Sequence, residues 1–491
     1  METSVMDIAR ELVMLIILLL PCWFLLFKRI KKDPRSLPPG PPYWWLVGNI
    51  FHLKFFSRNN SFQCVMHKLE ATYGPIFTLR SGSTPFIVVM GAQETREGLV
   101  EKGHVFDRRP PSAGPTTIGS TPHGPLWRTL RKNLATEIFQ PVRLKAFRPG
   151  RERAVEGLVD RLRQEAAKNA GAVVKLSENI RVTVFGILIY MCFGVEMDVG
   201  KLWDFQEVMA AMLERSRLLA LDYHACPLLD FFQSEKEGNE IFAQGGGLFV
   251  RLVQKRRRML AEGTANGTAY VDTLMALQLS EAELLGLCAE FVHAGLHSTS
   301  LTIQFAVAIL MKHPHVQDKL YEEVKNADAE GESLAKMAYL NAVVMETLRT
   351  HMPGYFTLPY AVTRSCTLAG YDIPEKAVVY FYLESMTKDA RLWKEPSDFV
   401  PERFLGAEVD VTGTKEMKMI PFGSGRRMCP GFGVGMLHLR LIVTRLVQAF
   451  EWKCLEGETV DLSERNGFQK VMAKPLRSLG SPLKALIEER P

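Results

Sequence analysis

The stretch Phe422-Gly-Ser-Gly-Arg-Arg-Met-Cys-Pro-Gly431 decides the fold of this chain. It places Cys429 in a glycine-rich turn, with Phe422 seven residues before it and Gly431 two residues after it. Glycine lets the backbone turn through angles that other residues resist, so amide N–H groups can approach the sulfur and stabilise its negative charge. Phe422 can cover the sulfur and exclude water, and Arg427 can pair with a carboxylate. A thiolate held in this way can be the axial ligand of a haem iron.

The alternative interpretation of the same turn is a buried free cysteine, because most single cysteines behave as small apolar residues. However, Phe-x-x-Gly-x-Arg-x-Cys-x-Gly fixes several residue types at once, and this pattern resembles the cysteine loop of the cytochrome P-450 superfamily of haem-thiolate monooxygenases. The resemblance implies a mainly α fold with small β-sheets. It also implies haem b (iron protoporphyrin IX) with Cys429 as the iron ligand. In that family the thiolate pushes electron density onto the iron and favours O–O cleavage.

The composition is that of a globular protein with a large core, since 47% of the 491 residues are apolar and 23% are charged. A net charge of +6 is mild for this length and no nucleic-acid motif accompanies it, so no nucleic-acid partner is expected. The eight cysteines lack the spacing of zinc or redox motifs. This favours a reducing compartment, with one cysteine acting as a ligand.

An apolar, uncharged run over residues 12–27 predicts a membrane anchor. As a helix it would span about 24 Å, slightly less than the roughly 30 Å hydrocarbon core of a bilayer. Acidic residues lie before the run, and basic residues follow it at Lys28, Arg29, Lys31, Lys32 and Arg35. Positive residues stay on the cytoplasmic side, and no small-residue cleavage site follows. We therefore expect residues 1–27 to be an uncleaved anchor; a cleaved signal peptide is the alternative.

Residues 28–42 form a basic and proline-rich linker that ends in Leu37-Pro-Pro-Gly-Pro-Pro42. Proline fixes φ and removes N–H donors, so this hinge is expected to be stiff and non-helical. A proline-rich motif for a partner is the alternative reading. Anchor and hinge together resemble microsomal members of the family. This implies a single-pass protein of the endoplasmic reticulum membrane, in contact with lipid, whose catalytic domain (residues 43–491) is cytosolic.

The catalytic domain reads as mostly helix with short strand pairs, of which residues 76–79 and 86–90 predict an early hairpin. Trp127 and Arg131 are four residues apart in a helical stretch, so they share one face. The resemblance implies that both lie over the haem propionates, with Arg427 as a further partner. Tyr360 occupies a place where relatives often carry a basic propionate partner, and tyrosine can donate a hydrogen bond there but cannot neutralise charge.

Glu346 and Arg349 form a Glu-x-x-Arg pair on another predicted helix. Alone, the pair would indicate a solvent-exposed ion pair of small energetic value. The resemblance instead places it with Arg403, from Pro401-Glu-Arg-Phe404, in a buried charge cluster behind the haem. Two arginines around one buried carboxylate would satisfy its charge, so the expected role of this cluster is structural.

A long helix is predicted to begin after Ser280, which forms a capping box with Glu283, and to end at Lys312 before His313-Pro314. Its middle reads Ala294-Gly-Leu-His-Ser-Thr-Ser300. The resemblance implies that Ala294 and Gly295 leave room beside the haem for dioxygen and substrate. Relatives usually carry an acid and then a threonine next, whereas this chain has His297 and Ser298.

Cleavage of the O–O bond needs protons at the distal oxygen. Serine keeps the hydroxyl of threonine but loses the methyl group that restricts its rotamer. Histidine, with an ordinary pKa of about 6.5, can transfer protons near neutral pH. We therefore predict that Ser298 and His297 form an altered proton relay, with Thr299 as another possible source of the hydroxyl. The alternative is tolerated drift, with ordered water carrying the protons.

Three apolar loops are candidate substrate walls by their position in the family: residues 110–122, 352–358 and 468–472. The side chains expected to face a hydrophobic ligand are those of Phe356, Leu358, Phe468 and Val471.

The resemblance is to plant microsomal members in particular, on Arg427-Met-Cys-Pro-Gly431 and Trp127-Arg-Thr-Leu-Arg-Lys-Asn133. It implies a monooxygenase that takes electrons from an NADPH-dependent cytochrome P-450 reductase, docked at a basic surface around Arg128, Lys132 and Arg426. The substrate is expected to be a hydrophobic small molecule, with terpenoids of specialised metabolism favoured. A fatty-acid in-chain hydroxylase or epoxidase, a reductase-independent haem-thiolate isomerase or dehydratase, and a haem-binding scaffold without turnover remain as alternatives.

Overall fold

The computed structural model describes residues 29–30, 37–44, 49, 61–81, 84–110, 116–168, 173–205, 235–328, 332–375, 377–406, 409–454, 460–464, 470, 472 and 485–489. The predicted anchor (1–27), the linker apart from residues 29–30 and 37–42, and the predicted pocket residues Phe468 and Val471 lie outside the described residues.

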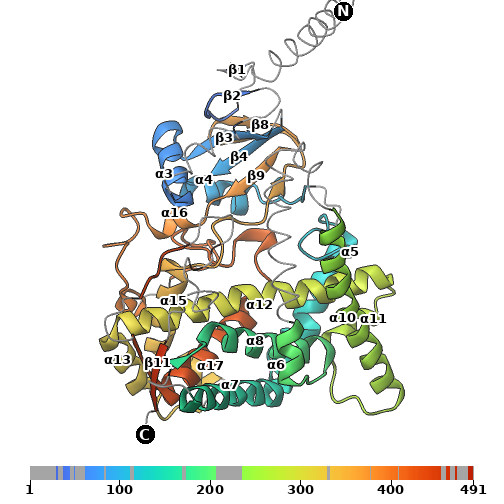
Figure 1. Cartoon of the computed structure of the whole chain (residues 1–491). Coiled ribbons are helices and arrows are strands. Elements are labelled where there is room, and N and C mark those ends of the chain that lie inside the picture. Colours follow the sequence, from blue (N-terminus) through green and yellow to red (C-terminus); the bar gives the residue numbers. More distant parts are fainter. Residues whose placement is uncertain are drawn as a thin grey trace, which may run out of the picture.

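The long helix α12 (Glu281–Lys312) crosses the middle of the molecule, between the sheet and the other long helices (Figure 1). The predicted capping box is confirmed. Ser280 Oγ accepts a hydrogen bond from the backbone N–H of Glu283, and the Glu283 carboxylate accepts one from the backbone N–H of Ser280. The helix ends at Lys312, because the residue before a proline disfavours the helical conformation. This helix therefore has the predicted ends.

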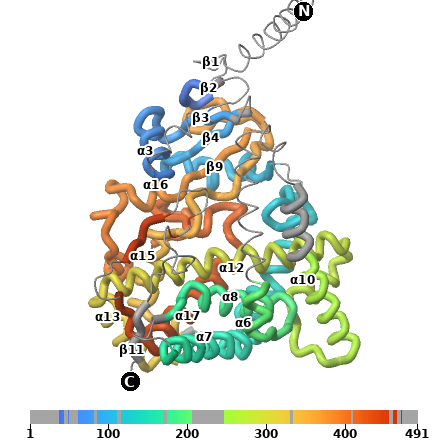
Figure 2. Tube along the Cα trace, in the orientation of Figure 1, coloured from blue at the N-terminus to red at the C-terminus, as the bar shows by residue number. Residues whose placement is uncertain are grey.

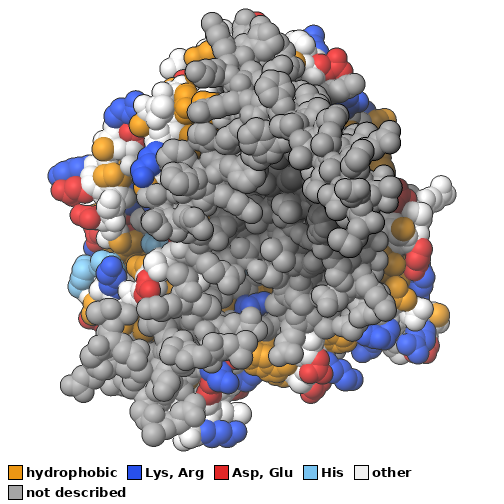
Figure 3. All heavy atoms as spheres, turned by 45° about the horizontal axis from the view of Figure 1, so that its top comes forward, with side chains coloured by type: hydrophobic (Ala, Val, Ile, Leu, Met, Phe, Trp, Pro, Cys, Tyr) orange, Lys and Arg blue, Asp and Glu red, His pale blue; other side chains and the backbone are white. Residues whose placement is uncertain are grey.

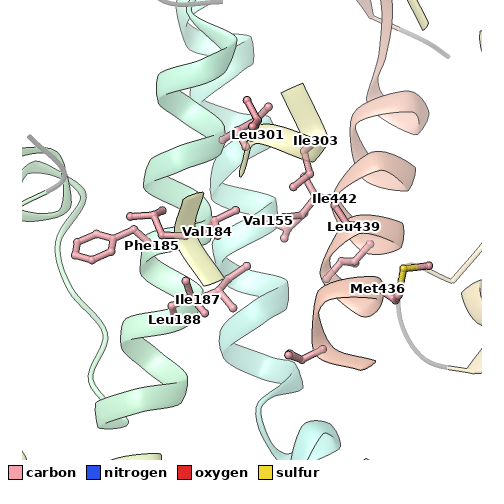
Figure 4. Packing of buried hydrophobic residues seen from close by; sticks show 14 of the residues in the cluster. Val155, Val184, Phe185, Ile187, Leu188, Leu301, Ile303, Met436, Leu439 and Ile442 are labelled. Atoms are coloured by element: carbon pink, nitrogen blue, oxygen red, sulfur yellow. The ribbon is translucent and has the colours of Figure 1, made fainter. Parts of the chain in front are cut away.

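Two further apolar helices, α8 (Leu176–Phe193) and α17 (Phe432–Ala449), pack against α12. These three described helices are long and apolar enough to cross a membrane, yet more than half of the apolar window of each is buried inside the fold. Their side chains meet those of α7 (Arg148–Lys168) in one layer, where Figure 4 shows Val155, Val184, Ile303 and Ile442. Their apolar character thus forms the core.

A four-stranded sheet in the order β3-β4-β9-β6 lies beside the helical part. The predicted hairpin is confirmed as β3 (Ile76–Ser81) and β4 (Thr84–Val89), which are antiparallel. The strand β9 (Val378–Phe381) then pairs with β4 in parallel, and β6 (Tyr360–Ala361) pairs with β9 in antiparallel fashion. The sheet therefore joins the first quarter of the chain to its last third, as the blue and orange tubes of Figure 2 show.

The other described elements complete a mainly α fold with small β-sheets, as the sequence predicts. The helices are α3 (Phe62–Tyr73), α4 (Ala92–Arg96), α5 (Pro125–Asn133), α6 (Pro141–Ala146), α10 (Glu235–Ala261), α11 (Tyr270–Met275), α13 (Pro314–Val324), α14 (Glu332–Lys336), α15 (Ala338–Thr350) and α16 (Glu384–Thr387). Short π- and 3₁₀-helical turns are η1 (Glu97–Glu101), η2 (Leu134–Ile138), η4 (Pro401–Phe404) and η5 (Gly425–Arg427). The strands are β1 (Arg29–Ile30), β2 (Tyr43–Trp44), β5 (Val173–Val174), β7 (Cys366–Leu368), β8 (Tyr371–Ile373), β10 (Phe450–Cys454) and β11 (Ala485–Glu489).

The proline-rich hinge is fastened to the sheet. Thr78 of β3 donates hydrogen bonds from its side chain to the carbonyl oxygen of Pro38 (2.7 Å) and from its backbone N–H to that of Pro39 (2.8 Å). A Cβ atom on Gly40 would lie 2.0 Å from the Thr78 carbonyl oxygen, so only glycine fits there. Residues 37–42 form neither helix nor strand.

Charged side chains of both signs are interspersed among the described residues around the edge of the face shown in Figure 3. This distribution accords with the near balance of 60 basic and 54 acidic residues in the chain.

Candidate active site

A cavity of about 380 Å³ brings most of the predicted site residues together. It lies between α12, α5, the cysteine loop and the loop at 352–358. The predicted residues on its wall are Trp127, Arg131, Ala294, Gly295, Ser298, Thr299, Phe356, Leu358, Tyr360, Phe422, Arg427, Cys429 and Gly431. His297 is not among the residues that line it.

The cysteine loop is closed by a hydrogen bond of 2.8 Å from the backbone N–H of Cys429 to the carbonyl oxygen of Phe422. Gly425 has a φ of 68°, and a Cβ atom on it would lie 2.1 Å from the carbonyl oxygen of Leu99. The loop therefore requires glycine for both its conformation and its close approach to η1. The first helical residue of α17, Phe432, packs edge to face on Phe422 with ring centroids 4.9 Å apart.

Cys429 is exposed and lines the cavity. Burial raises the pKa of the Cys429 thiol, whereas the backbone N–H of Gly431 and the charge of Arg131 lower it. The loop thus directs a thiol, with one amide donor and one cation nearby, into the cavity. These groups stabilise the anionic form of the sulfur, as an iron ligand needs.

The cavity has a cationic end around Trp127. The guanidinium groups of Arg131 and Arg427 lie 5.5 and 4.9 Å from the centroid of its ring. Trp127 Nε1 is buried and has no hydrogen-bond partner among the described residues. Because an unsatisfied buried donor costs about 1–3 kcal/mol, this N–H indicates an acceptor supplied by a ligand.

A haem fits this donor set. Its iron would bind the thiolate, its porphyrin would pack against the apolar walls, and its two propionates would pair with the indole N–H and the two guanidinium groups. Among the residues present, Cys429 would hold the iron, and Trp127, Arg131 and Arg427 would hold the propionates.

Arg109 is a further cation at this end that the sequence analysis missed. Its guanidinium lies 4.5 Å from the centroid of the Tyr360 ring, and both residues line the cavity. Arg109 also donates to the carbonyl oxygens of Leu358 (3.0 Å) and Pro359 (2.8 Å). It therefore supplies the charge that Tyr360 lacks, from a different segment of the chain. No local pattern around Arg108-Arg109-Pro110 marked it.

The wall formed by α12 carries Ala294, Gly295, Ser298 and Thr299. Ser298 Oγ donates a hydrogen bond of 2.8 Å to the carbonyl oxygen of Ala294. A Cβ atom on Gly295 would lie 2.8 Å from a methyl carbon of Leu188, so the glycine also allows α8 to pack closely against α12. The structure brings two of the three predicted relay residues to the cavity and leaves His297 off its wall.

Glu346, Arg349 and Arg403 form the predicted charge cluster outside the cavity. Arg349 Nε and Nη2 lie 2.6 and 2.8 Å from the two oxygens of Glu346, and both side chains are fully buried. Arg403 Nε lies 3.0 Å from the same carboxylate. Arg349 also donates to the carbonyl oxygens of Thr387 and Pro396. The cluster therefore ties α15 to η4 and to the loop before it.

Glu290 is an acid on the cavity wall that the sequence analysis also missed. It lies one helical turn before Ala294 on α12, and Ser298 and Thr302 continue the same stripe of residues at intervals of four. That spacing from Ala294 was the signal that could have found it.

Comparisons with known proteins match this chain to one family. Residues 38–479 match the family described as cytochrome P450. Cytochrome P450 89A9 from Arabidopsis thaliana is 37% identical, over 90% of this chain and 93% of that protein. Isoflavone 2'-hydroxylase from Glycyrrhiza echinata is 29% identical, over 91% and 92% of the two chains. Pluviatolide synthase from Podophyllum peltatum is also 29% identical, over 97% and 98%.

Proposed function

The chain belongs to the cytochrome P450 family, and on that premise we propose that it is a membrane-anchored monooxygenase that oxidises a hydrophobic specialised metabolite with a haem held by Cys429. Because it belongs to this family, the protein is an oxidoreductase of the monooxygenase type. The role of each site residue, the substrate and the electron donor are parts of the proposal.

The observation that carries the proposal is the Cys429 thiol in the same cavity as Trp127, Arg131 and Arg427. When bound, the haem supplies the activation of dioxygen. The protein's residues then have distinct tasks. Cys429 binds the iron, and the three residues of the cationic end orient the ring. Phe422 shields the sulfur from water.

Ser298 is the residue best placed to handle protons on the α12 wall. The Ser298 hydroxyl lines the cavity and donates its proton in a hydrogen bond to the Ala294 carbonyl oxygen. From there it can exchange that proton with water in the cavity. Thr299 also lines the cavity, whereas His297 does not, which leaves histidine an indirect part in the relay. A hydroxyl at this wall supports oxygen activation over a reductase-independent isomerase or dehydratase.

The substrate side of the cavity is apolar, which supports a hydrophobic small molecule. Its wall includes Phe356 and Leu358, as well as Phe139, Leu188, Leu287 and Phe291. Terpenoids are the class that we test first. Isoflavones come second, because one relative is an isoflavone 2'-hydroxylase. Fatty acids, the alternative class for an in-chain hydroxylase or epoxidase, complete the panel.

For electron supply we propose an NADPH-dependent cytochrome P450 reductase. The exposed side chains of Arg128 and Lys132 on α5, with that of Arg426 in the cysteine loop, offer a basic docking surface. Residues 1–27 would anchor the chain in the endoplasmic reticulum membrane, with the linker at 28–42 leading to a cytosolic catalytic domain at 43–491.

The test compares Cys429→Ser with Cys366→Ser, a matched change at a half-buried cysteine of β7. In microsomes, Cys429→Ser should abolish the red-shifted Soret band of the reduced carbon-monoxide complex, and Cys366→Ser should keep it. Retention of the band in Cys429→Ser would exclude this cysteine as the ligand. Incubation of the unsubstituted protein with the substrate panel, with and without NADPH and reductase, then separates a monooxygenase from an isomerase.

A further inference from the structure

The carboxylate of Glu290 holds the backbone of a segment that crosses the cavity wall. Its Oε2 accepts a hydrogen bond of 2.7 Å from the backbone N–H of Ile118, and its Oε1 accepts one of 2.6 Å from that of Gly119. All three residues line the cavity. We call residues 117–121 the wall segment.

The wall segment is also held through its carbonyl oxygens. Arg109 Nε donates to the carbonyl oxygen of Gly119 at 3.0 Å, and Arg427 Nη2 donates to that of Thr121 at 2.9 Å. One carboxylate and two guanidinium groups therefore hold this short stretch of backbone. Its N–H groups bind Glu290 on α12, and its C=O groups bind Arg109 and Arg427; we call this set of hydrogen bonds the clamp. Hydrogen bonds to ionised groups are stronger than those between neutral groups, so the clamp should hold the wall segment more firmly than neutral loop contacts would.

Gly119 is part of the clamp because of its size. A Cβ atom there would lie 2.8 Å from Oε1 of Glu290 and 3.6 Å from a methyl carbon of Leu358. The first contact is too short, and the mobile partner is the end of the Glu290 side chain. An alanine at 119 would therefore push the carboxylate away from the amide that it binds.

Glu290 is half-buried on a cavity wall that is largely apolar. Burial raises the pKa of Glu290, and the two amide donors, followed by Thr117 and Arg109, act against that shift. A half-buried carboxylate is tolerated when its charge is satisfied, and here the two amides of the wall segment, with Thr117 and Arg109, satisfy it.

We propose that Glu290 is a positioning residue that fixes the wall segment and so sets the width of the substrate pocket. The inference rests on the proposed function, in which this cavity receives both haem and substrate. Because Glu290 binds the wall segment mainly through the backbone amides of Ile118 and Gly119, we expect its effect to be on which ligand sizes fit. Loss of the clamp should free Ile118 and Leu358 to move apart and admit bulkier ligands.

The experiment uses the full-length protein in microsomes or detergent, with imidazole and 4-phenylimidazole as small and bulky probes of the ferric haem. Their Kd values are read from the Soret shift. In Glu290→Gln and in Gly119→Ala, we expect the ratio of the two Kd values to change by about tenfold in favour of the bulkier probe. The double variant should add little to either single one, since both break the same contact. Glu281→Gln, at an exposed position of α12, should leave the ratio unchanged.

A second measurement follows the clamp directly. Amide hydrogen exchange of the peptide that contains Ile118 and Gly119 should quicken by about tenfold or more in both single variants and stay unchanged in Glu281→Gln. Unchanged exchange in Glu290→Gln would overturn the clamp, and quicker exchange with an unchanged Kd ratio would overturn its role in pocket width. If the unsubstituted protein gives no Soret shift with imidazole, the proposed function itself fails, which is a different result from an unchanged ratio.

Discussion

Arg131 on α5 donates a hydrogen bond to the carbonyl oxygen of Met428, the residue that precedes Cys429. The same guanidinium lies beside the Trp127 ring, and its charge acts against the rise that burial causes in the pKa of Cys429. One side chain thus connects the cationic end of the cavity to the cysteine loop. Its removal should affect both the grip on the propionates and the position of the sulfur.

We expect Arg131→Gln to lose haem about 10- to 100-fold faster than the unsubstituted protein, since a charged hydrogen bond contributes roughly 1.5–3 kcal/mol. Transfer of haem to excess apomyoglobin measures the rate. Arg128→Gln, an exposed arginine on the same helix, is the control and should not change it. Equal rates for the two variants would show that Arg131 does not hold the haem.

Ser298→Ala should raise the hydrogen peroxide released per NADPH consumed, because the only change is loss of a hydroxyl on the cavity wall. One side chain that transfers a proton usually speeds a reaction by a large factor. The coupling, which is the product formed per NADPH consumed, should therefore fall by about tenfold or more. His297→Asp should keep or improve coupling, since His297 is not on that wall. Unchanged peroxide release in Ser298→Ala would retire the relay, and a collapse in His297→Asp would show that the imidazole itself is required.

Glu346→Ala should destabilise the protein by about 3–5 kcal/mol, because it leaves the fully buried guanidinium of Arg349 without its carboxylate. Urea unfolding followed by circular dichroism measures the change. Lys319→Ala is the matched control: it breaks an exposed ion pair with Glu402 and should cost no more than about 1 kcal/mol. Similar midpoints for the two variants would contradict a structural role of the buried cluster.

His351 should make the protein less stable in mild acid. Burial, followed by the nearby Lys470 and Lys388, lowers the pKa of His351 to about 3, and its ring stacks on Phe305 with centroids 4.5 Å apart. The unfolded chain binds this proton near pH 6.5 and the folded chain near pH 3. Stability from neutral His351 is therefore present above pH 6.5 and is lost as the pH falls towards 3, at roughly 1.4 kcal/mol per pH unit.

His351→Gln should remove about 2 kcal/mol of the stability difference between pH 7 and pH 5. Glutamine can still bond to Thr350 Oγ1, which lies 2.9 Å from His351 Nδ1. His104→Gln, at an exposed position, should leave the pH dependence as it is. The same slope in His351→Gln as in the unsubstituted protein would show that other groups cause the acid sensitivity.

The sequence predicts features that depend on local chemistry. Both ends of α12 follow from Ser280, Glu283 and Pro314, because caps and prolines act within a few residues. The cysteine loop is equally local, since the hydrogen bond from Cys429 to Phe422 closes within one motif. The burial of the cluster of Glu346 could not be derived from its spacing, and the resemblance alone suggested it.

Features that depend on distant segments escaped prediction. Arg109 reaches Tyr360 across about half of the chain, and Glu290 on α12 reaches the amides of Ile118 and Gly119 in a turn far away in the sequence. His297 is a residue for which the sequence predicted a place at the cavity and the structure shows another. A position in a motif suggests a role, but each helical residue turns by about 100° from the last, and the cavity lies on the side of Ala294 and Ser298.

The hydrogen bonds from Thr78 to Pro38 and Pro39 attach the proline-rich hinge to the edge strand β3. Force applied at the hinge would enter β3 directly and pass through β4 and β9 to β6, which carries Tyr360. The strands β1 and β2 pair with each other from either side of the hinge, so an insertion between residues 31 and 36 would fall between two attached points. An insertion between residues 38 and 42 would instead displace the hinge from Thr78.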